Sequence, residues 1–227
     1  MGTALSAGPK RGFDIVAALA GLVATTPMLL AGALAVWLTS RGPVFYRARR
    51  AGLNGRPFDM LKLRTMRVET PVADRQVTAP EDDRVTPIGR VLRRWKIDEL
   101  PQLWHVLTGE MSVVGPRPES WDIVQQHYTE EQRRVLRVRP GLVSPADVWW
   151  YPDLSYHDPP MPGVSLQEHY LRHHLPAKLS VELRYVERPG FLVDLRTIGQ
   201  TIFCLLVRTW RLPARRRVAP LGPGDLS

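Results

Sequence analysis

Two adjacent carboxylates, Asp98 and Glu99, precede the short helical pattern that begins at Leu100-Pro101. At a helix start, successive side chains diverge by about 100°, so both carboxylates can converge on one cation. The positive end of the helix also favours the ionised form, which suits Asp98 to the role of nucleophile or metal ligand. A plain acidic cap in the first turn is the commoner use of such residues. The dipeptide alone leaves both interpretations open.

Basic residues on both sides of this pair favour chemistry. Carboxylates beside arginines suit a magnesium-bound diphosphate, with the metal on the carboxylates and the phosphate oxygens on the guanidinium groups. Positioning and charge neutralisation supply most of the catalysis in phosphoryl transfer, and an aspartate can attack phosphorus to form an acyl phosphate. We therefore predict Mg²⁺ held by Asp98 and Glu99, and phosphate-binding residues drawn from the nearby cations. The cations expected to bind phosphate are Lys62, Arg64, Arg93 and Arg117.

A β-hairpin and short helices must position these residues. Asn54-Gly55 is a strong signal for a two-residue hairpin turn, and on the returning strand, over 57–66, Lys62 and Arg64 share one face because side chains alternate. Thr86 then reads as an N-cap followed by Pro87. The helix it starts carries an apolar stripe of Ile88, Val91, Leu92 and Trp95.

Further helices are expected along the rest of the chain. Leucines at helical spacing predict a short one that ends near Gly109. The later segments predicted as helical are 121–139, 166–188 and 191–210.

The segment from Ile15 to Trp37 carries no charge. At about 1.5 Å per residue, a straight helix of this length crosses a hydrocarbon core of roughly 30 Å. Pro27 interrupts it by removing a helix hydrogen bond, and the hydroxyls of Thr25 and Thr26 can satisfy the freed carbonyls.

Both flanks of this segment are basic, although a single span normally has its positive charges on the cytoplasmic side. We therefore predict a re-entrant helix that breaks at Pro27 and returns to the cytoplasmic face. Asp14, at the edge of the apolar run, would stay near the headgroups or pair with Arg11. A straight span with a proline kink, a signal peptide and N-myristoylation at Met1-Gly2 are the alternatives.

Composition narrows the class of protein. The chain has 227 residues, a net charge of +9 and the single cysteine Cys204, so an internal disulfide framework is excluded. A mean hydropathy of −0.18 argues against a multi-pass membrane protein. The positive charge points to an anionic partner, which is nucleic acid, lipid headgroups or a phosphorylated small molecule.

Ordered motifs run from Lys10 to Asp147, and looser similarity extends to Asp194-Leu195. The motifs are KRGFD (10–14), GPVF (42–45), RAG (50–52), KLRTM (62–66), DRVT (83–86), DELPQL (98–103), MSVVGPRP (111–118) and RPG (139–141). This order resembles the bacterial sugar transferases of the monotopic phosphoglycosyl transferase family, in their minimal catalytic form.

The resemblance implies transfer of a sugar 1-phosphate from a UDP-sugar to polyprenyl (undecaprenyl) phosphate, with release of UMP, at the start of exopolysaccharide or glycoconjugate biosynthesis. It implies that Asp98 attacks the β-phosphorus to give a phosphosugar-enzyme intermediate, and that Glu99 helps hold Mg²⁺. Lys62, Arg93 and Arg117 match positions that contact phosphates, and Pro27 matches the helix break. The implied location is the bacterial inner membrane, with the catalytic domain on the cytoplasmic face and no nucleic acid as partner.

Three departures from the family pattern leave the sugar open. They are the run 140–146 after the RPG motif, Trp95-Lys96 before the carboxylate pair, and the aromatic loop 149–164. Each lies where the choice of sugar or nucleotide could be made. The oligomeric state, including a homodimer, is open as well.

The sequence thus predicts a mostly helical α+β fold with a re-entrant membrane helix, a β-hairpin and interfacial helices around the active site. The expected divisions are a membrane segment over 1–40, a catalytic domain over 41–212 and a basic flexible tail over 213–227. The competing hypothesis is a non-catalytic, membrane-tethered basic protein that binds anionic lipid or nucleic acid. It leaves Asp98 and Glu99 unexplained, because carboxylates would repel the same ligand.

Overall fold

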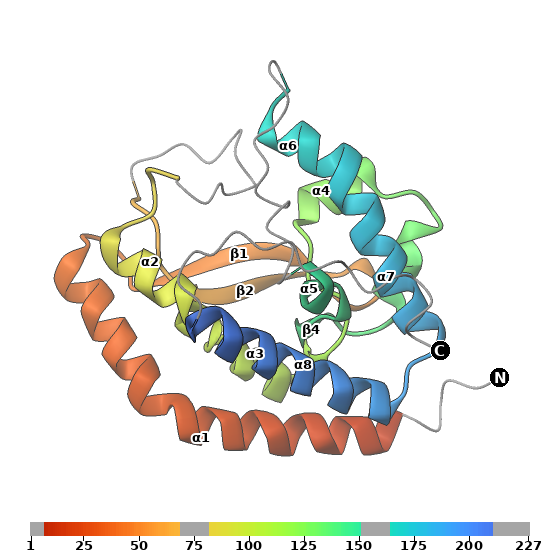
Figure 1. Cartoon of the computed structure of the whole chain (residues 1–227), viewed down its shortest axis with the longest axis horizontal. Coiled ribbons are helices and arrows are strands. Elements are labelled where there is room, and N and C mark those ends of the chain that lie inside the picture. The colour runs from red at the N-terminus through yellow and green to blue at the C-terminus, as the bar shows by residue number, and fades with distance from the viewer. Residues whose placement is uncertain (1–6, 69–81, 151–163, 211–227) are drawn as a thin grey trace.

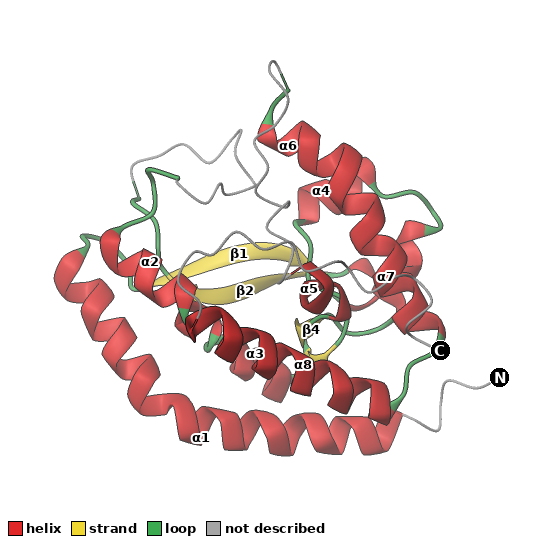
Figure 2. Cartoon of the chain, in the orientation of Figure 1, coloured by secondary structure: helices red, strands yellow, loops and turns green. Residues whose placement is uncertain are grey.

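The computed structural model describes residues 7–68, 82–150 and 164–210. The predicted tail over 213–227, the myristoylation pattern and most of the aromatic loop lie outside these residues. The fold is mostly helical α+β, as expected, with a long apolar N-terminal helix and a small β-hairpin (Figures 1 and 2). The helices are α1 (Ala7–Thr39), α2 (Pro87–Arg94), α3 (Gln102–Thr108), α4 (Trp121–His127), α5 (Pro145–Trp150), α6 (Leu166–His169), α7 (Leu175–Glu187) and α8 (Phe191–Trp210). The strands are β1 (Phe45–Ala51), β2 (Pro57–Leu63), β3 (Ser112–Val114) and β4 (Gly141–Val143).

Helix α1 is long and apolar enough to cross a bilayer, judged by length and composition. It contains Pro27 and bends about midway, so that its two arms border the rest of the molecule along the bottom and one side of Figure 1. The hydroxyls of Thr25 and Thr26 donate to the carbonyls of Gly21 and Leu22, at 2.7 and 2.6 Å. Such bonds to the preceding turn bend helices. Their acceptors precede Val23, whose carbonyl is the one that Pro27 leaves without a helix donor, so the prediction that these hydroxyls satisfy the freed carbonyl was wrong.

Side-chain hydrogen bonds fasten both ends of α1 to the body of the protein. Near its start, Arg11 donates to two carbonyls of α3, and Asp14 accepts from Ser112 Oγ and the Val113 N–H at 2.9 and 3.0 Å. The prediction that Asp14 stays near headgroups or pairs with Arg11 was therefore wrong, because the carboxylate is buried and satisfied by β3. Past its end, Arg64 donates to the carbonyls of residues 40–42.

The β-hairpin forms where the sequence predicts it, with a longer turn. Strands β1 and β2 pair antiparallel from Phe45 opposite Leu63 to Ala51 opposite Pro57. Five residues, 52–56, make the turn, and Asn54 and Gly55 adopt positive φ values of 54° and 72°. Both residues thus have a left-handed backbone, but a 3-10 turn replaces the predicted two-residue loop.

Strands β3 and β4 form a parallel pair that needs two glycines. A Cβ atom on Gly115 would lie 2.4 Å from the carbonyl oxygen of Arg139, and one on Gly141 would lie 2.2 Å from the nitrogen of Gly115. Any side chain would therefore push the two backbones apart. This close approach fixes the start of the proline-flanked segment, 115–118, that carries Arg117.

The predicted helix over 121–139 is wrong in its length. Helix α4 ends at His127, and a separate 3-10 helix covers Gln132–Arg137. Between them, Thr129 Oγ1 accepts from the Gln132 N–H while Gln132 Oε1 accepts from the Thr129 N–H. This reciprocal capping box begins a new helical turn and so ends the earlier one.

Helix α2 begins as predicted, because Thr86 accepts a hydrogen bond from the Gly89 N–H. Of the predicted stripe, Ile88 and Leu92 pack against the second arm of α1, whereas Val91 and Trp95 are about half exposed. Gly89 lies against the end of β2, since a Cβ there would be 2.2 Å from the carbonyl oxygen of Thr65. This contact sets the distance between α2 and the strand that carries Lys62.

We predict that Gly89→Ala lowers the stability of the protein by about 1–3 kcal/mol, because the added methyl group must displace backbone. Gly199→Ala is the matched control: nothing lies within 4 Å of its added Cβ, and alanine favours helix by up to about 1 kcal/mol. Thermal unfolding in detergent checks both variants. A Gly89→Ala unfolding midpoint equal to that of the wild type would contradict this packing.

Candidate active site

The carboxylate pair lies in a 3-10 turn, Ile97–Glu99, between α2 and α3. The sequence predicted the first turn of a regular helix, but α3 itself starts only at Gln102. Both carboxylates are nearly buried, with Asp98 6% and Glu99 8% exposed. A buried carboxylate stays ionised only beside cations or hydrogen-bond donors.

Glu99 is the centre of the charged cluster. Its Oε1 accepts from Lys62 Nζ at 3.0 Å and from Arg117 Nη2 at 2.7 Å, and its Oε2 lies 3.7 Å from Lys96 Nζ. Burial alone would raise the pKa of Glu99, but Arg117, Lys62 and Lys96 outweigh it and hold the pKa well below its usual range. Glu99 is therefore a carboxylate anion at neutral pH.

Arg117 joins Glu99 to a second acidic residue, Asp147. Its Nη1 donates to Asp147 Oδ2 at 2.9 Å, while its Nη2 donates to Glu99. Asp147 lies in the first turn of α5, so this bridge links the turn that holds the carboxylate pair to the segment after β4. The planar guanidinium is held from two sides and its orientation is fixed.

Asp98 differs from its neighbour. Among the described residues, its Oδ1 is a buried oxygen with no hydrogen-bond partner. Burial, with the charge of Glu99 added, raises the pKa of Asp98, although Lys62, Lys96 and Arg93 act in the opposite direction. A poorly solvated carboxylate oxygen beside cations is suited to attack an electrophile or to bind a metal ion.

The cluster brings together most of the residues predicted from the sequence. Lys62 and Arg117 contact Glu99 directly, and the charge of Arg93 acts on Asp98 while its Nε donates to Thr65 Oγ1 at 2.8 Å. Arg64 is not brought in: its guanidinium donates to the carbonyls that follow α1, although it was expected to share a face with Lys62. Its observed contacts are those of a structural link to α1.

The donor set fits Mg²⁺. Mg²⁺ in proteins is held by one or two carboxylates, and substrate phosphates and water complete its octahedral shell. The unpartnered Oδ1 of Asp98 offers one oxygen ligand, and Glu99 Oε2, which lies 3.7 Å from Lys96 Nζ, offers another. Within the described ranges, no group of three or more His, Cys, Asp and Glu side chains converges as a protein-only metal site.

Glu182, on α7, supports the site from behind. Its Oε1 accepts from the backbone N–H of Arg117 at 2.8 Å and from Ser144 Oγ at 3.1 Å. One oxygen therefore holds the segment of Arg117 and the start of α5, where Asp147 lies. Burial raises the pKa of Glu182 to about 7, although the nearby Lys178 and the Arg117 N–H act to lower it.

A second buried ion pair lies behind Arg117. Glu119 pairs with Lys178 at 2.8 Å and also accepts from the hydroxyl of Tyr170. Burial alone would raise the pKa of Glu119, but Lys178 and Arg50 outweigh it and lower the pKa to about 2.

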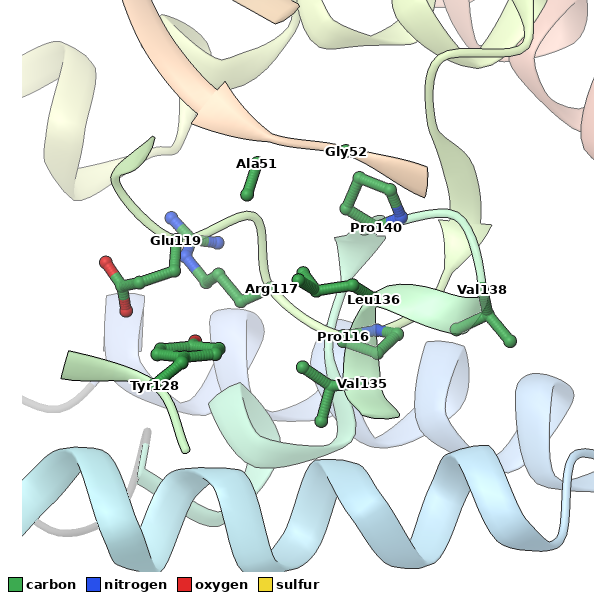
Figure 3. Close-up of a pocket in the computed structure, with 10 residues that line it drawn as sticks. All are labelled: Ala51, Gly52, Pro116, Arg117, Glu119, Tyr128, Val135, Leu136, Val138 and Pro140. Atoms are coloured by element: carbon green, nitrogen blue, oxygen red, sulfur yellow. The ribbon is translucent and has the colours of Figure 1, made fainter. Parts of the chain in front are cut away.

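Figure 3 shows the small pocket that Glu119 lines together with Arg117 and Tyr128. Its volume of about 10 Å³ suits a single water molecule and not a nucleotide. Its lining does not include Asp98 or Glu99, so it is a structural feature and not the reaction centre.

Three residues of the site were missed as such from the sequence: Asp147, Glu182 and Lys96. Asp147 and Glu182 are lone acidic residues on helices, and each meets Arg117 through a contact between segments that are distant in the sequence. Lys96 was noted as a departure from the family pattern, without a role. Its left-handed backbone cannot be predicted from the sequence, because lysine has no preference for that conformation.

Comparison with known proteins gives consistent matches. The family model for bacterial sugar transferases matches residues 5–208. A UDP-glucose:undecaprenyl-phosphate glucose-1-phosphate transferase of Caulobacter vibrioides is 46% identical over 142 residues, which are 61% of this chain and 53% of the relative. An undecaprenyl-phosphate glucose phosphotransferase of Komagataeibacter xylinus is 36% identical over 199 residues, covering 85% of this chain and 35% of the relative. The uncharacterized sugar transferase EpsL of Bacillus subtilis is 35% identical over 223 residues, covering 96% of this chain and 98% of the relative.

The matched region is thus about half of the Caulobacter protein and about a third of the Komagataeibacter protein. The Bacillus protein matches over nearly its full length.

We predict that Glu182→Gln stabilises the protein increasingly as the pH rises from 5 to 8. The folded-state pKa of Glu182, about 7, lies above its ordinary value of 4.5, so the folded state favours the protonated form. That contribution is complete below pH 4.5 and is lost as the pH passes 7, by an amount of the order of 3 kcal/mol. Glutamine does not titrate and keeps the accepting oxygen.

Unfolding midpoints of wild type and Glu182→Gln across this pH range check the prediction. The two proteins should nearly coincide at pH 5 and separate by pH 8. A constant difference at every pH would show that Glu182 does not carry the expected pKa.

Proposed function

Because the chain belongs to the bacterial sugar transferase family, we propose that it transfers a sugar 1-phosphate from a UDP-sugar to a polyprenyl phosphate and releases UMP. The observation that carries the proposal is the contrast between two neighbouring buried carboxylates. Glu99 is held by cations, whereas an oxygen of Asp98 has no hydrogen-bond partner among the described residues. One carboxylate is restrained and the other is poised to react.

In the first step, an oxygen of Asp98 attacks the β-phosphorus of the UDP-sugar. The new P–O bond joins the sugar phosphate to Asp98, and the bond between the β-phosphorus and the bridging oxygen breaks. UMP leaves with that electron pair. In the second step, an oxygen of the polyprenyl phosphate attacks the same phosphorus and restores the carboxylate of Asp98. Water in place of this acceptor would give hydrolysis of the donor instead.

The cations of the cluster supply the charge that this reaction needs. Lys62 and Arg117 lie within hydrogen-bond distance of Glu99, so phosphate oxygens entering beside Glu99 come within reach of both. Arg93 adds a third positive charge on the side of Asp98. Phosphoryl-transfer sites act mainly through such fixed positioning and charge neutralisation.

Asp98 and Glu99 are the residues that would hold Mg²⁺, through Asp98 Oδ1 and Glu99 Oε2. The bound ion would neutralise charge on the diphosphate and on the departing UMP. The protein's own contribution is to keep Glu99 oriented, which its contacts to Lys62 and Arg117 achieve.

For the membrane, we propose that α1 enters the cytoplasmic leaflet, bends at Pro27 and returns to the same face. The hydrogen bonds of Arg11 and Asp14 at its start and of Arg64 after its end tie both ends to one body, which supports this arrangement. A straight span would place the two ends about a bilayer apart. The catalytic domain would then lie at the headgroups of the bacterial inner membrane, where the phosphate of the acceptor lies, and the product would start a polysaccharide or glycoconjugate.

The alternative of a non-catalytic basic protein that binds anionic lipid or nucleic acid is less favoured. Such a protein gains nothing from burying Asp98 and Glu99 among the cations that should bind its ligand. The two functions predict opposite effects when these carboxylates are neutralised.

The test is UMP release by the detergent-solubilised protein with Mg²⁺, undecaprenyl phosphate and a panel of UDP-sugars. We expect repeated turnover to require both the lipid and one particular UDP-sugar, because without the lipid the two-step route releases at most one UMP per protein molecule. Continued release without the lipid would instead identify a hydrolase, and no release with any donor would contradict the proposed transfer.

We predict that Asp98→Asn lowers UMP release by at least about 10³-fold, since the amide is a poor nucleophile for phosphorus and the loss exceeds about 4 kcal/mol of transition-state stabilisation. Asp59→Asn is the matched control, because Asp59 is an exposed carboxylate on the neighbouring strand β2. Its rate should equal that of the wild type. If Asp98→Asn retained activity and bound anionic vesicles more tightly than the wild type, the binding-protein alternative would be favoured.

A further inference from the structure

Lys96 adopts a backbone conformation that its residue type does not favour. Its φ of 57° and ψ of 21° lie in the left-handed region, where the Cβ atom of an ordinary L-residue is crowded. In the part of the chain that the structure describes, Asn54 is the other non-glycine residue with positive φ, and asparagine tolerates that region well.

The position is one that glycine normally occupies. Helix α2 ends with Trp95 as its C-cap, and the residue after the C-cap is commonly a left-handed glycine. The backbone of Lys96 does what a glycine would do there: its N–H donates to the carbonyl of Arg93 and its carbonyl accepts from the Glu99 N–H. The lysine side chain is therefore not needed for the turn, and its presence there calls for a role of the side chain itself.

That side chain reaches the carboxylate pair. Lys96 Nζ lies 3.7 Å from Glu99 Oε2, within the range of an ion pair but longer than a hydrogen bond. The other oxygen of Glu99 already accepts from Lys62 and Arg117 at 3.0 and 2.7 Å. About 28% of the Lys96 side chain is exposed, against 25% for Arg117 and 19% for Lys62, so an incoming ligand can reach it.

Cations surround the carboxylate pair. Lys62, Arg117 and Lys96 lie beside Glu99, and the charge of Arg93 acts on Asp98. An incoming diphosphate brings at least two further negative charges. Lys96 makes the longest of the three contacts to Glu99, at 3.7 Å, so it is the cation that loses least by moving toward them.

We propose that Lys96 is a substrate-binding residue whose ammonium group binds a non-bridging phosphate oxygen of an incoming substrate. This inference rests on the proposed transfer reaction and adds to it. The phosphate belongs either to the diphosphate of the UDP-sugar or to the monophosphate of the polyprenyl acceptor. A purely structural role, in which the lysine only balances the negative end of α2, is the competing explanation.

Lys96→Gly separates these explanations, because glycine relieves the backbone and removes the charge together. We expect the unfolding midpoint to equal or exceed that of the wild type, while kcat/KM for UMP release falls at least tenfold. A rise in KM for the UDP-sugar assigns the contact to the donor, and a rise in KM for undecaprenyl phosphate assigns it to the acceptor. Lys96→Arg should recover most of the loss, since it restores a cation.

Asn54→Gly is the matched control, because it places glycine at the other left-handed position, in the hairpin turn, and should leave kcat/KM unchanged.

Calorimetric titration of UDP and of undecaprenyl phosphate with Mg²⁺ present gives a second readout without turnover, and at least one of the two should bind Lys96→Gly several-fold more weakly. If the wild type is active and Lys96→Gly has the same kcat/KM, the role proposed for Lys96 fails while the proposed transfer stands. If the wild type released no UMP, the proposed transfer would fail, and equal affinities of both proteins for both ligands would overturn the role of Lys96 as well.

Discussion

Burial of Asp98 and Glu99 side by side obliges the chain to bring cations to them, and much of the architecture follows from that requirement. The cations come from separate elements: Lys62 from β2, Arg117 from the segment after β3 and Lys96 from the turn after α2. Removing one partner from a buried pair leaves an uncompensated charge, which costs several kcal/mol. The hairpin, the parallel pair β3–β4 and α2 are therefore held together around Glu99 as well as by apolar packing.

The same cluster is supported from both sides of the molecule. On the C-terminal side, Glu182 of α7 holds the backbone of Arg117, and Asp147 of α5 holds its guanidinium. On the N-terminal side, a Cβ on Gly32 of α1 would lie 3.0 Å from Leu63 and 3.2 Å from Ile97, the neighbours of Lys62 and Asp98. The apolar helix thus packs directly behind the residues that carry the charges. This places the candidate reaction centre close to whatever surface α1 enters.

The parts predicted from the sequence are those set by local signals. The Thr86-Pro87 start of α2, the stop at Gly109 and the helices over 166–188 and 191–210 follow from caps and apolar spacing, and the structure confirms them. The predicted helix over 121–139 is too long because Thr129 and Gln132, which have the spacing of a capping box, begin a new helical turn.

The parts that could not be predicted depend on contacts between distant residues. Lys62 and Arg64 alternate correctly on one strand, yet Lys62 meets Glu99 while Arg64 meets the end of α1. Charge and spacing alone do not distinguish the two. Likewise, Asp147 and Glu182 meet Arg117 across 30 and 65 residues of sequence, and no local pattern marks either acid as part of the site.

The central claim is that the carboxylate of Asp98 is a nucleophile toward phosphorus. The most direct measurement is the intact mass of the purified protein after mixing with the active UDP-sugar and Mg²⁺ in the absence of polyprenyl phosphate, followed by an acid quench. The account predicts an added mass of one sugar phosphate, located on the peptide that contains Asp98 and absent from Asp98→Asn. An enzyme that transfers sugar phosphate normally but never gains this mass, at any quench time, would contradict the covalent role of Asp98.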